Sequence, residues 1–228
     1  MDPRVVQFWY SPGAILEFAD LAVAYCTTSP VKSTSALEKV LGEGRAGAFM
    51  AMSLAKLSGV EVWVRLVDPA RQAPDVEIMY LDQHGKHQAQ DILGVEVATY
   101  RALETGALAD FILRTKLNRE HAYGEHTAIV IYVQKAISGK DAEETHRQIL
   151  DAEVPSLVIL LGQVDDDLFQ TRVVYPSLSG PVDVRSSEAL DSSQLMVAEA
   201  RRGMSREQKA SADPIVTPNP FMAYVDDA

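Results

Sequence analysis

Two acidic residues in the first half of the chain are placed where they could hold a divalent metal ion. Asp75 follows Pro74 at the head of a predicted strand, and Glu96 lies within the apolar run of residues 92–99. The polar loop between these strands contains Gly85, and a hairpin centred there would set Asp75 level with Glu96. Two carboxylates facing each other across adjacent strands provide the hard oxygen ligands that Mg²⁺ prefers. Bound Mg²⁺ could activate water for a hydrolytic reaction.

The elements around these acids occur in a distinctive order. Residues 42–100 supply a helix, a strand, a Pro-Asp pair at the head of the next strand, and an apolar-Glu-apolar strand after a hairpin. This order resembles the PD-(D/E)XK nuclease superfamily, and the later strand, helix and strand are compatible with the rest of that fold. The resemblance implies an α/β protein with a restriction-endonuclease-like core, a mixed central sheet flanked by helices. It also implies metal-dependent hydrolysis of nucleic acid, with Asp75 and Glu96 as the Mg²⁺ ligands.

Two positions depart from the pattern of that superfamily. The family places a Lys two residues after the strand Glu, whereas this chain has Ala98. We expect Arg101 or Lys116 to replace the missing lysine. The helix carboxylate of the pattern falls at Gly47, and the nearest acid is Glu43. Because Glu43 lies one helical turn before Gly47, it shares the same helix face and could assist at the site.

These departures leave a second function open. A catalytically inactive descendant of the fold could serve in binding or assembly, and Ala98 favours that hypothesis. The formal net charge of −11 also favours it, because phosphate binding is driven by Lys and Arg side chains. A local basic groove is still compatible with an acidic total, since only the surface that faces the ligand matters.

A third function follows from the glycines of residues 42–47, which spell GxGxxG. In a dinucleotide-binding fold these glycines join a buried strand to a helix, and an acidic residue about 20 positions later binds the ribose. Asp68 has that spacing. The segment before Gly42 has the pattern of a capped helix, however, so this hypothesis requires Val40 and Leu41 to form a central parallel strand instead.

Hydrophobic periodicity and turn residues predict a mixed order of helices and strands. A capping-box spacing at Ser35 and Glu38 starts the second helix, which Gly42, Glu43 and Gly44 could interrupt. A second such pair, Asp141 with Glu144, is expected to cap a later helix. The predicted strands are 5–10, 60–67, 75–81, 92–99, 128–133, 157–161 and 168–175, and the predicted helices are 14–25, 35–57, 103–117, 141–150 and 188–202.

Composition places the chain among ordinary globular proteins. Of the 228 residues, 47% are hydrophobic and 23% charged, and no apolar run approaches the length of a membrane span. Cys26 is the single cysteine, so no intrachain disulfide can form, and together with the absence of a signal-peptide pattern this predicts a cytoplasmic protein. We expect one domain over residues 1–203 and a polar, Pro-containing tail over 204–228. The tail is a candidate contact for a protein partner or a second copy of the chain.

Overall fold

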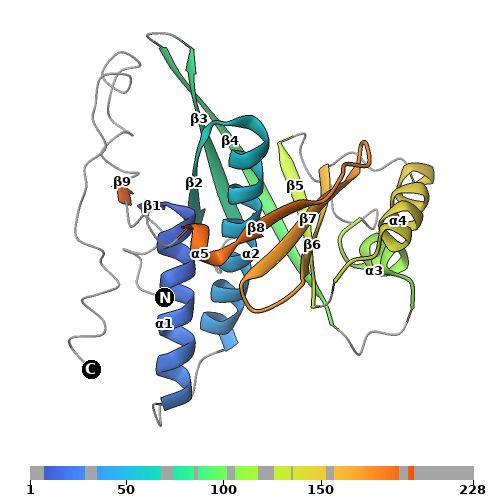
Figure 1. Cartoon of the computed structure of the whole chain (residues 1–228), viewed down its shortest axis with the longest axis horizontal. Helices are drawn as coiled ribbons and strands as arrows, with labels where there is room; N and C mark the ends of the chain where they lie inside the picture. Colours follow the sequence, from blue (N-terminus) through green and yellow to red (C-terminus); the bar gives the residue numbers. More distant parts are fainter. Residues whose placement is uncertain are drawn as a thin grey trace.

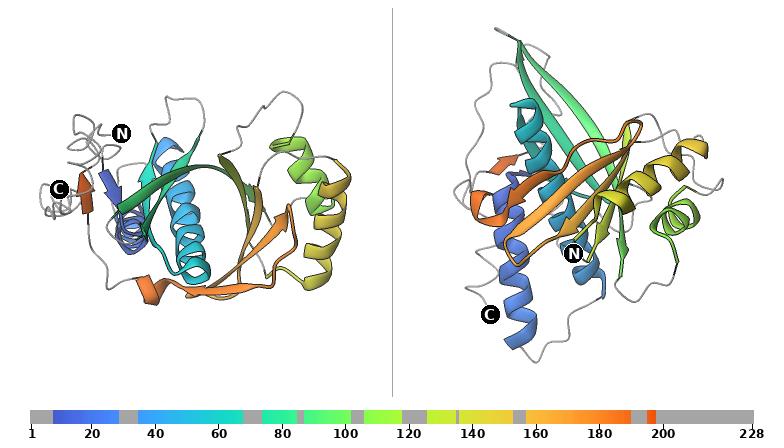
Figure 2. Two further views of the ribbon diagram at one scale, coloured as in Figure 1. Left: turned by 90° about the horizontal axis from the view of Figure 1, so that it is seen from above. Right: turned by 45° about the vertical axis from the view of Figure 1, so that its right-hand side comes forward.

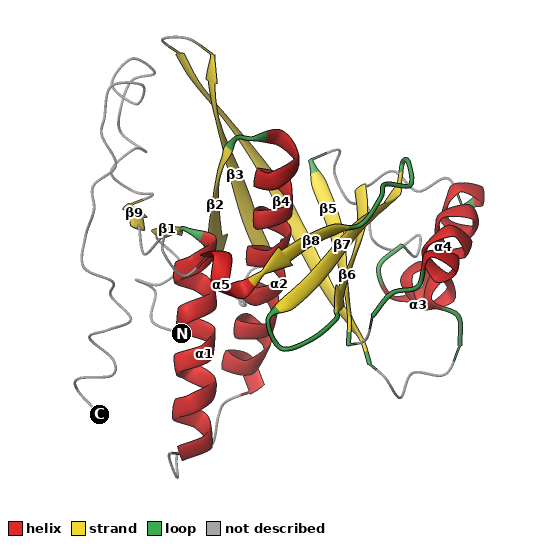
Figure 3. Ribbon diagram, viewed as in Figure 1, coloured by secondary structure: helices red, strands yellow, loops and turns green. Residues whose placement is uncertain are grey.

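The computed structural model describes residues 8–28, 35–67, 74–84, 87–101, 106–117, 126–134, 136–152, 157–189 and 195–197. These residues form five helices and nine strands (Figures 1 and 3). In chain order the elements are β1 (Phe8–Tyr10), α1 (Pro12–Thr28), α2 (Ser35–Ser58), β2 (Glu61–Leu66), β3 (Val76–His84), β4 (His87–Tyr100), α3 (Leu108–Thr115), β5 (Thr127–Val133), α4 (Gly139–Asp151), β6 (Leu157–Gln163), β7 (Leu168–Tyr175), β8 (Val182–Arg185), α5 (Ser186–Ala189) and β9 (Leu195–Val197).

All nine strands belong to one mixed sheet with the order β8-β7-β6-β5-β4-β3-β2-β1-β9. Strands β2, β3 and β4 form an antiparallel meander, β4, β5 and β6 run parallel, and β7 and β8 return antiparallel. The parallel connections run through α3 and α4, as parallel strands require a crossover. The prediction of an α/β protein with a mixed sheet flanked by helices is therefore confirmed.

The sheet is strongly curled, and α2 lies on its concave side while α3 and α4 cover the convex side (Figure 2). The concave core packs Phe49 and Met50 of α2 against inward side chains such as Val64 and Ile78. The convex core packs Ile112 of α3 and other apolar residues of α3 and α4 against β4, β5, β6 and β7. Successive residues of β4 therefore face different helices, because side chains alternate along a strand.

The hairpin of β3 and β4 is longer than the polar loop of the sequence suggests. Val76 pairs with Val95, and the ladder continues to His84 and His87. The predicted ends at residues 81 and 92 were therefore wrong. The predicted ends lie where the alternation of apolar residues stops. Backbone hydrogen bonds do not depend on side-chain polarity, so the pairing continues through the polar residues.

Helix α2 runs without a break through the glycines of residues 42–47. The strand–turn–helix that dinucleotide binding requires is not formed, because Val40 and Leu41 are helical. Gly44 has a packing role instead: a Cβ at this position would lie 2.6 Å from Cδ2 of the buried Leu66. Gly59 adopts a φ of 69° and donates its N–H to the Ala55 carbonyl at 2.8 Å. This left-handed residue ends the helix.

Later elements correct three predictions. Helix α3 begins at Leu108, since Gly106 has a φ of 124° and Ala107 is extended. Helix α4 is capped by Ser138, whose Oγ accepts the Asp141 N–H at 3.0 Å, so Asp141 is a first-turn residue and not the cap. The predicted helix over 188–202 is wrong where the structure describes it. Only α5 is helical there, and residues 195–197 form strand β9, which pairs with β1.

In the part of the chain that the structure describes, no helix combines the length and apolar character that crossing a membrane requires. Residues 204–228, the predicted tail, lie outside the described residues.

Candidate functional site

The β3–β4 ladder places Asp75 beside Glu96, as predicted. The Val76–Val95 pair sets the register, and Asp75 donates its backbone N–H to the Val95 carbonyl at 3.0 Å. Oδ2 of Asp75 accepts the Val97 N–H at 2.9 Å. The carboxylate of Asp75 therefore takes over a backbone hydrogen bond of β4 at the point where β3 begins.

A third charged group joins these acids from helix α3. Lys116 caps the C-terminal end of α3, and its Nζ lies 2.7 Å from Glu96 Oε2 and 3.7 Å from Asp75 Oδ2. The side chains are largely buried, with exposed fractions of 17% for Lys116, 15% for Asp75 and 8% for Glu96. We call these three residues the carboxylate–lysine site. Its position on the convex side follows from β4, where Glu96 shares a face with Tyr100 of the convex core.

One oxygen of this site has no hydrogen-bond partner among the described residues. Oε1 of Glu96 is buried and accepts no hydrogen bond from the part of the chain that the structure describes. A buried carboxylate oxygen without a partner is costly, so this atom is expected to be satisfied by water, a cation or another donor. Among the described residues, no group of three or more His, Cys, Asp or Glu side chains is placed to hold a metal ion. Two carboxylates nevertheless fit Mg²⁺, which commonly takes one or two carboxylates and completes its shell with water and substrate phosphate.

The other predicted site residues lie elsewhere. Arg101 follows the last residue of β4 and is exposed, so Lys116 and not Arg101 contacts Glu96. Glu43 is a half-buried residue of α2. A Cβ at Gly47, one turn later, would lie 3.0 Å from Cγ1 of Val76, the neighbour of Asp75. Glu43 thus belongs to the helix near the start of β3, but this helix covers the concave side, whereas Lys116 reaches Glu96 on the convex side.

Gly94 has a role at the site that the sequence patterns did not predict. Its N–H donates to the His126 carbonyl at 2.9 Å, and a Cβ on Gly94 would lie 3.2 Å from Cβ of Pro74. The missing side chain leaves room for Pro74, the residue before Asp75, to pack closely against β4. A glycine inside an otherwise apolar strand was the available signal, because such glycines often mark close approach of another segment.

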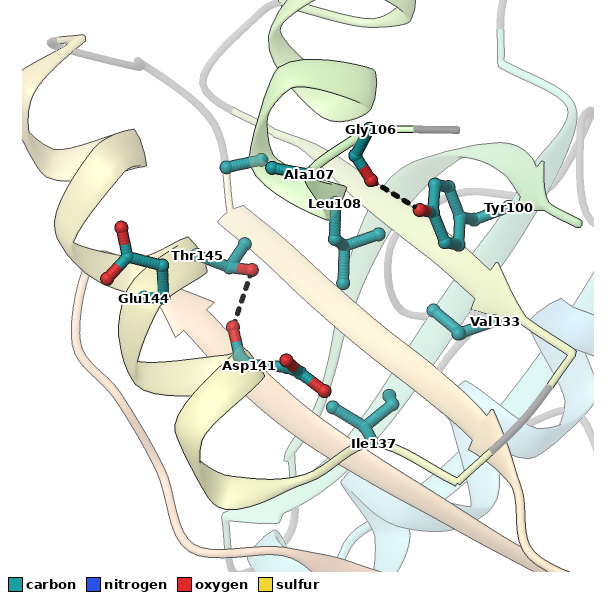
Figure 4. Close-up of a pocket in the computed structure, with 10 residues that line it drawn as sticks. Tyr100, Gly106, Ala107, Leu108, Val133, Ile137, Asp141, Glu144 and Thr145 are labelled. Carbon is teal, nitrogen blue, oxygen red and sulfur yellow. Dashed lines mark hydrogen bonds between the residues drawn. The ribbon is translucent and has the colours of Figure 1, made fainter. Parts of the chain in front are cut away.

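A cavity of about 160 Å³ lies at the opposite end of α3. It is lined by the first residues of α3 and α4 and by the ends of β4 and β5, including Tyr100, Val133 and Asp141 (Figure 4). The Tyr100 hydroxyl donates to the Gly106 carbonyl at 2.8 Å. Since Lys116 follows the last turn of α3, this cavity is separate from the carboxylate–lysine site.

Comparisons of the chain with protein-family models, with curated proteins and with solved structures found no match.

Proposed function

We propose that this protein is a nuclease-like protein in which Asp75 and Glu96 bind Mg²⁺ for the hydrolysis of phosphodiester bonds in nucleic acid. The observation that carries the proposal is the buried, unpartnered Oε1 of Glu96 beside a second carboxylate. A preformed oxygen site of this kind suits a hard cation.

The order of the elements also supports the proposal. Helix α2, the antiparallel strands β2, β3 and β4, helix α3 and the parallel strand β5 follow one another as in the nuclease superfamily that the sequence resembles. Asp75 at the head of β3 and Glu96 in β4 occupy the two strand positions of that resemblance. Lys116 takes the place of the absent strand lysine, because Ala98 cannot provide an ammonium.

The chemistry would divide among the residues as follows. Mg²⁺, when bound, supplies Lewis-acid activation of water and charge stabilisation at the leaving oxygen. Asp75 and Glu96 provide its ligands, and the ladder hydrogen bond from Val97 fixes the Asp75 carboxylate. The Lys116 ammonium can donate a hydrogen bond to the attacking water or to a phosphate oxygen. The burial of the site limits competing water, which strengthens these interactions.

The alternative is a catalytically inactive protein of the same fold that acts in binding or assembly. One observation favours it: Lys116 already pairs with both carboxylates, so a structural ion pair accounts for most of the site. The net charge of −11 also disfavours a broad nucleic-acid surface.

The test is cleavage of single- and double-stranded DNA and RNA in Mg²⁺ or Mn²⁺. We expect Asp75→Asn and Glu96→Gln each to abolish cleavage while the variants stay folded. Glu77→Gln is the matched control, because Glu77 lies on β3 and pairs with Arg65 outside the site. Activity that survives in both site variants would exclude these acids as metal ligands, and an inactive wild type with intact metal binding would favour the binding or assembly role.

A further inference from the structure

We propose that Lys116 competes with the divalent cation for the Asp75–Glu96 pair and thereby sets the metal affinity of the site. This inference rests on the proposed metal site and concerns its regulation. It predicts that the lysine is a resident counter-ion in the metal-free protein.

The position of the ammonium carries the argument. Nζ of Lys116 lies 2.7 Å from Glu96 Oε2 and 3.7 Å from Asp75 Oδ2. It therefore occupies the space between the two carboxylates, where the attraction of both for a cation is strongest. The free Oε1 of Glu96 belongs to the same carboxylate as the lysine-bound oxygen. A metal ion at Oε1 would consequently lie within a few ångströms of the ammonium.

Two positive charges at such a separation repel strongly in a site with little water. A divalent ion must either displace the Lys116 ammonium or bind while the ammonium repels it. Either route makes binding to the wild-type protein weaker than binding to the two carboxylates alone. Removing the charge of Lys116 should therefore tighten metal binding by roughly tenfold or more.

The location of Lys116 makes displacement feasible. The residue caps the end of a short helix, and its backbone N–H is held by the Ile112 carbonyl at 3.0 Å. Its flexible side chain can therefore swing away while the backbone stays in place. A substrate phosphate is a natural acceptor for the released ammonium. Metal and phosphate should then favour each other's binding through this one residue.

The experiment is calorimetric titration of Mn²⁺ into the full-length wild type, Lys116→Met and Lys116→Gln. Met removes the charge and keeps an apolar side chain. Gln also removes the charge but keeps a hydrogen-bond donor for Glu96, so it serves as the second neutral variant in case Met impairs folding. Lys116→Arg retains the charge, so its affinity should stay near that of the wild type. Lys56→Met is the matched control, because Lys56 is exposed, pairs with Glu188 and gives the same change in net charge.

The proposal expects the neutral Lys116 variants to bind Mn²⁺ roughly tenfold or more tightly than the wild type and the Lys56 control. Binding seen only in the neutral variants would support the same conclusion. Wild-type binding that is unchanged or weakened in Lys116→Met and Lys116→Gln would overturn the competition and leave the nuclease proposal standing. If no protein of the series binds Mn²⁺, the metal site and the competition both fail.

Discussion

Nζ of Lys116 lies 2.7 Å from Oε2 of Glu96, although the lysine ends helix α3 and the glutamate lies inside strand β4. The pair therefore ties the crossover helix to the strand that precedes it. Because both side chains are largely buried, each depends on the other for compensation of its charge. Loss of Lys116 leaves the buried Glu96 carboxylate without its counter-ion, whereas loss of Glu96 leaves Lys116 with Asp75 at 3.7 Å.

This dependence predicts strong energetic coupling between the two residues. In a double-mutant cycle of Glu96→Gln and Lys116→Met, we expect a coupling free energy of about 1–2 kcal/mol, measured by urea denaturation without metal. The exposed pair Lys56–Glu188 gives the control cycle, for which about 0.5 kcal/mol is expected. Equal coupling in the two cycles would contradict the view that the burial of the site strengthens its ion pair.

Asp75 should matter for stability as well as for metal binding. Its Oδ2 accepts the Val97 N–H at 2.9 Å, so Asp75→Ala leaves a strand donor without its partner. We expect Asp75→Ala to lower the free energy of unfolding by about 1–3 kcal/mol, whereas Asp75→Asn keeps an acceptor and loses less. Urea denaturation measures the difference, and hydrogen exchange at the Val97 amide locates it. Equal losses for Ala and Asn would show that this hydrogen bond contributes little.

The glycines of α2 offer a test of the helix that replaces a nucleotide-binding turn. A Cβ added at Gly42 would meet no atom within 4 Å, whereas a Cβ at Gly44 would lie 2.6 Å from Leu66. We expect Gly42→Ala to stabilise the protein by about 0.5–1 kcal/mol, because Ala is the better helix former. Gly44→Ala should instead destabilise it by about 1 kcal/mol, because overpacking outweighs that gain. Thermal denaturation of the two variants measures both effects. A lower melting temperature for Gly42→Ala than for the wild type would show that residues 42–47 form a turn and not a helix.

The sequence predicted the alignment of the two acids because local patterns fix the geometry of a hairpin. A Pro-Asp pair, an apolar strand and a glycine-centred loop were enough to align Asp75 with Glu96, since strand pairing determines which residues face each other. Lys116 was one of two candidate cations, and sequence spacing could not choose between it and Arg101. That choice depends on how α3 crosses the sheet, which is a property of tertiary packing.

The errors occurred where distant segments decide the local structure. The predicted terminal helix failed because residues 195–197 pair with β1, at the far end of the chain. Strand β8 was missed because its four residues gain their structure from pairing with β7. Propensity is a weak guide in such places, since the partner strand overrides it.

Asp167 is the acid whose ionisation the fold stabilises most clearly among the described residues. Its carboxylate accepts hydrogen bonds from the Ser186 hydroxyl at 2.7 Å and the Ser187 N–H at 2.9 Å, and it pairs with Arg185. The hydrogen bond from Ser186 is the largest cause that lowers the pKa of Asp167 from its ordinary value of 3.8. A carboxylate whose pKa is lower in the folded state than in the unfolded chain stabilises the fold above the unfolded pKa, and this contribution fades as the pH falls.

We therefore expect the stability difference between the wild type and Asp167→Asn to be largest above pH about 5 and to shrink as the pH falls below about 4. The urea midpoint of each protein, measured from pH 6 to pH 3, gives this difference. Asp166→Asn is the control, because Asp166 is exposed on the same turn and its substitution removes the same charge. It should keep the pH profile of the wild type. A pH-independent difference for Asp167→Asn would mean that the hydrogen bonds from Ser186 and Ser187 do not favour the ionised carboxylate, and that Asp167 joins the β6–β7 turn to α5 without depending on its charge.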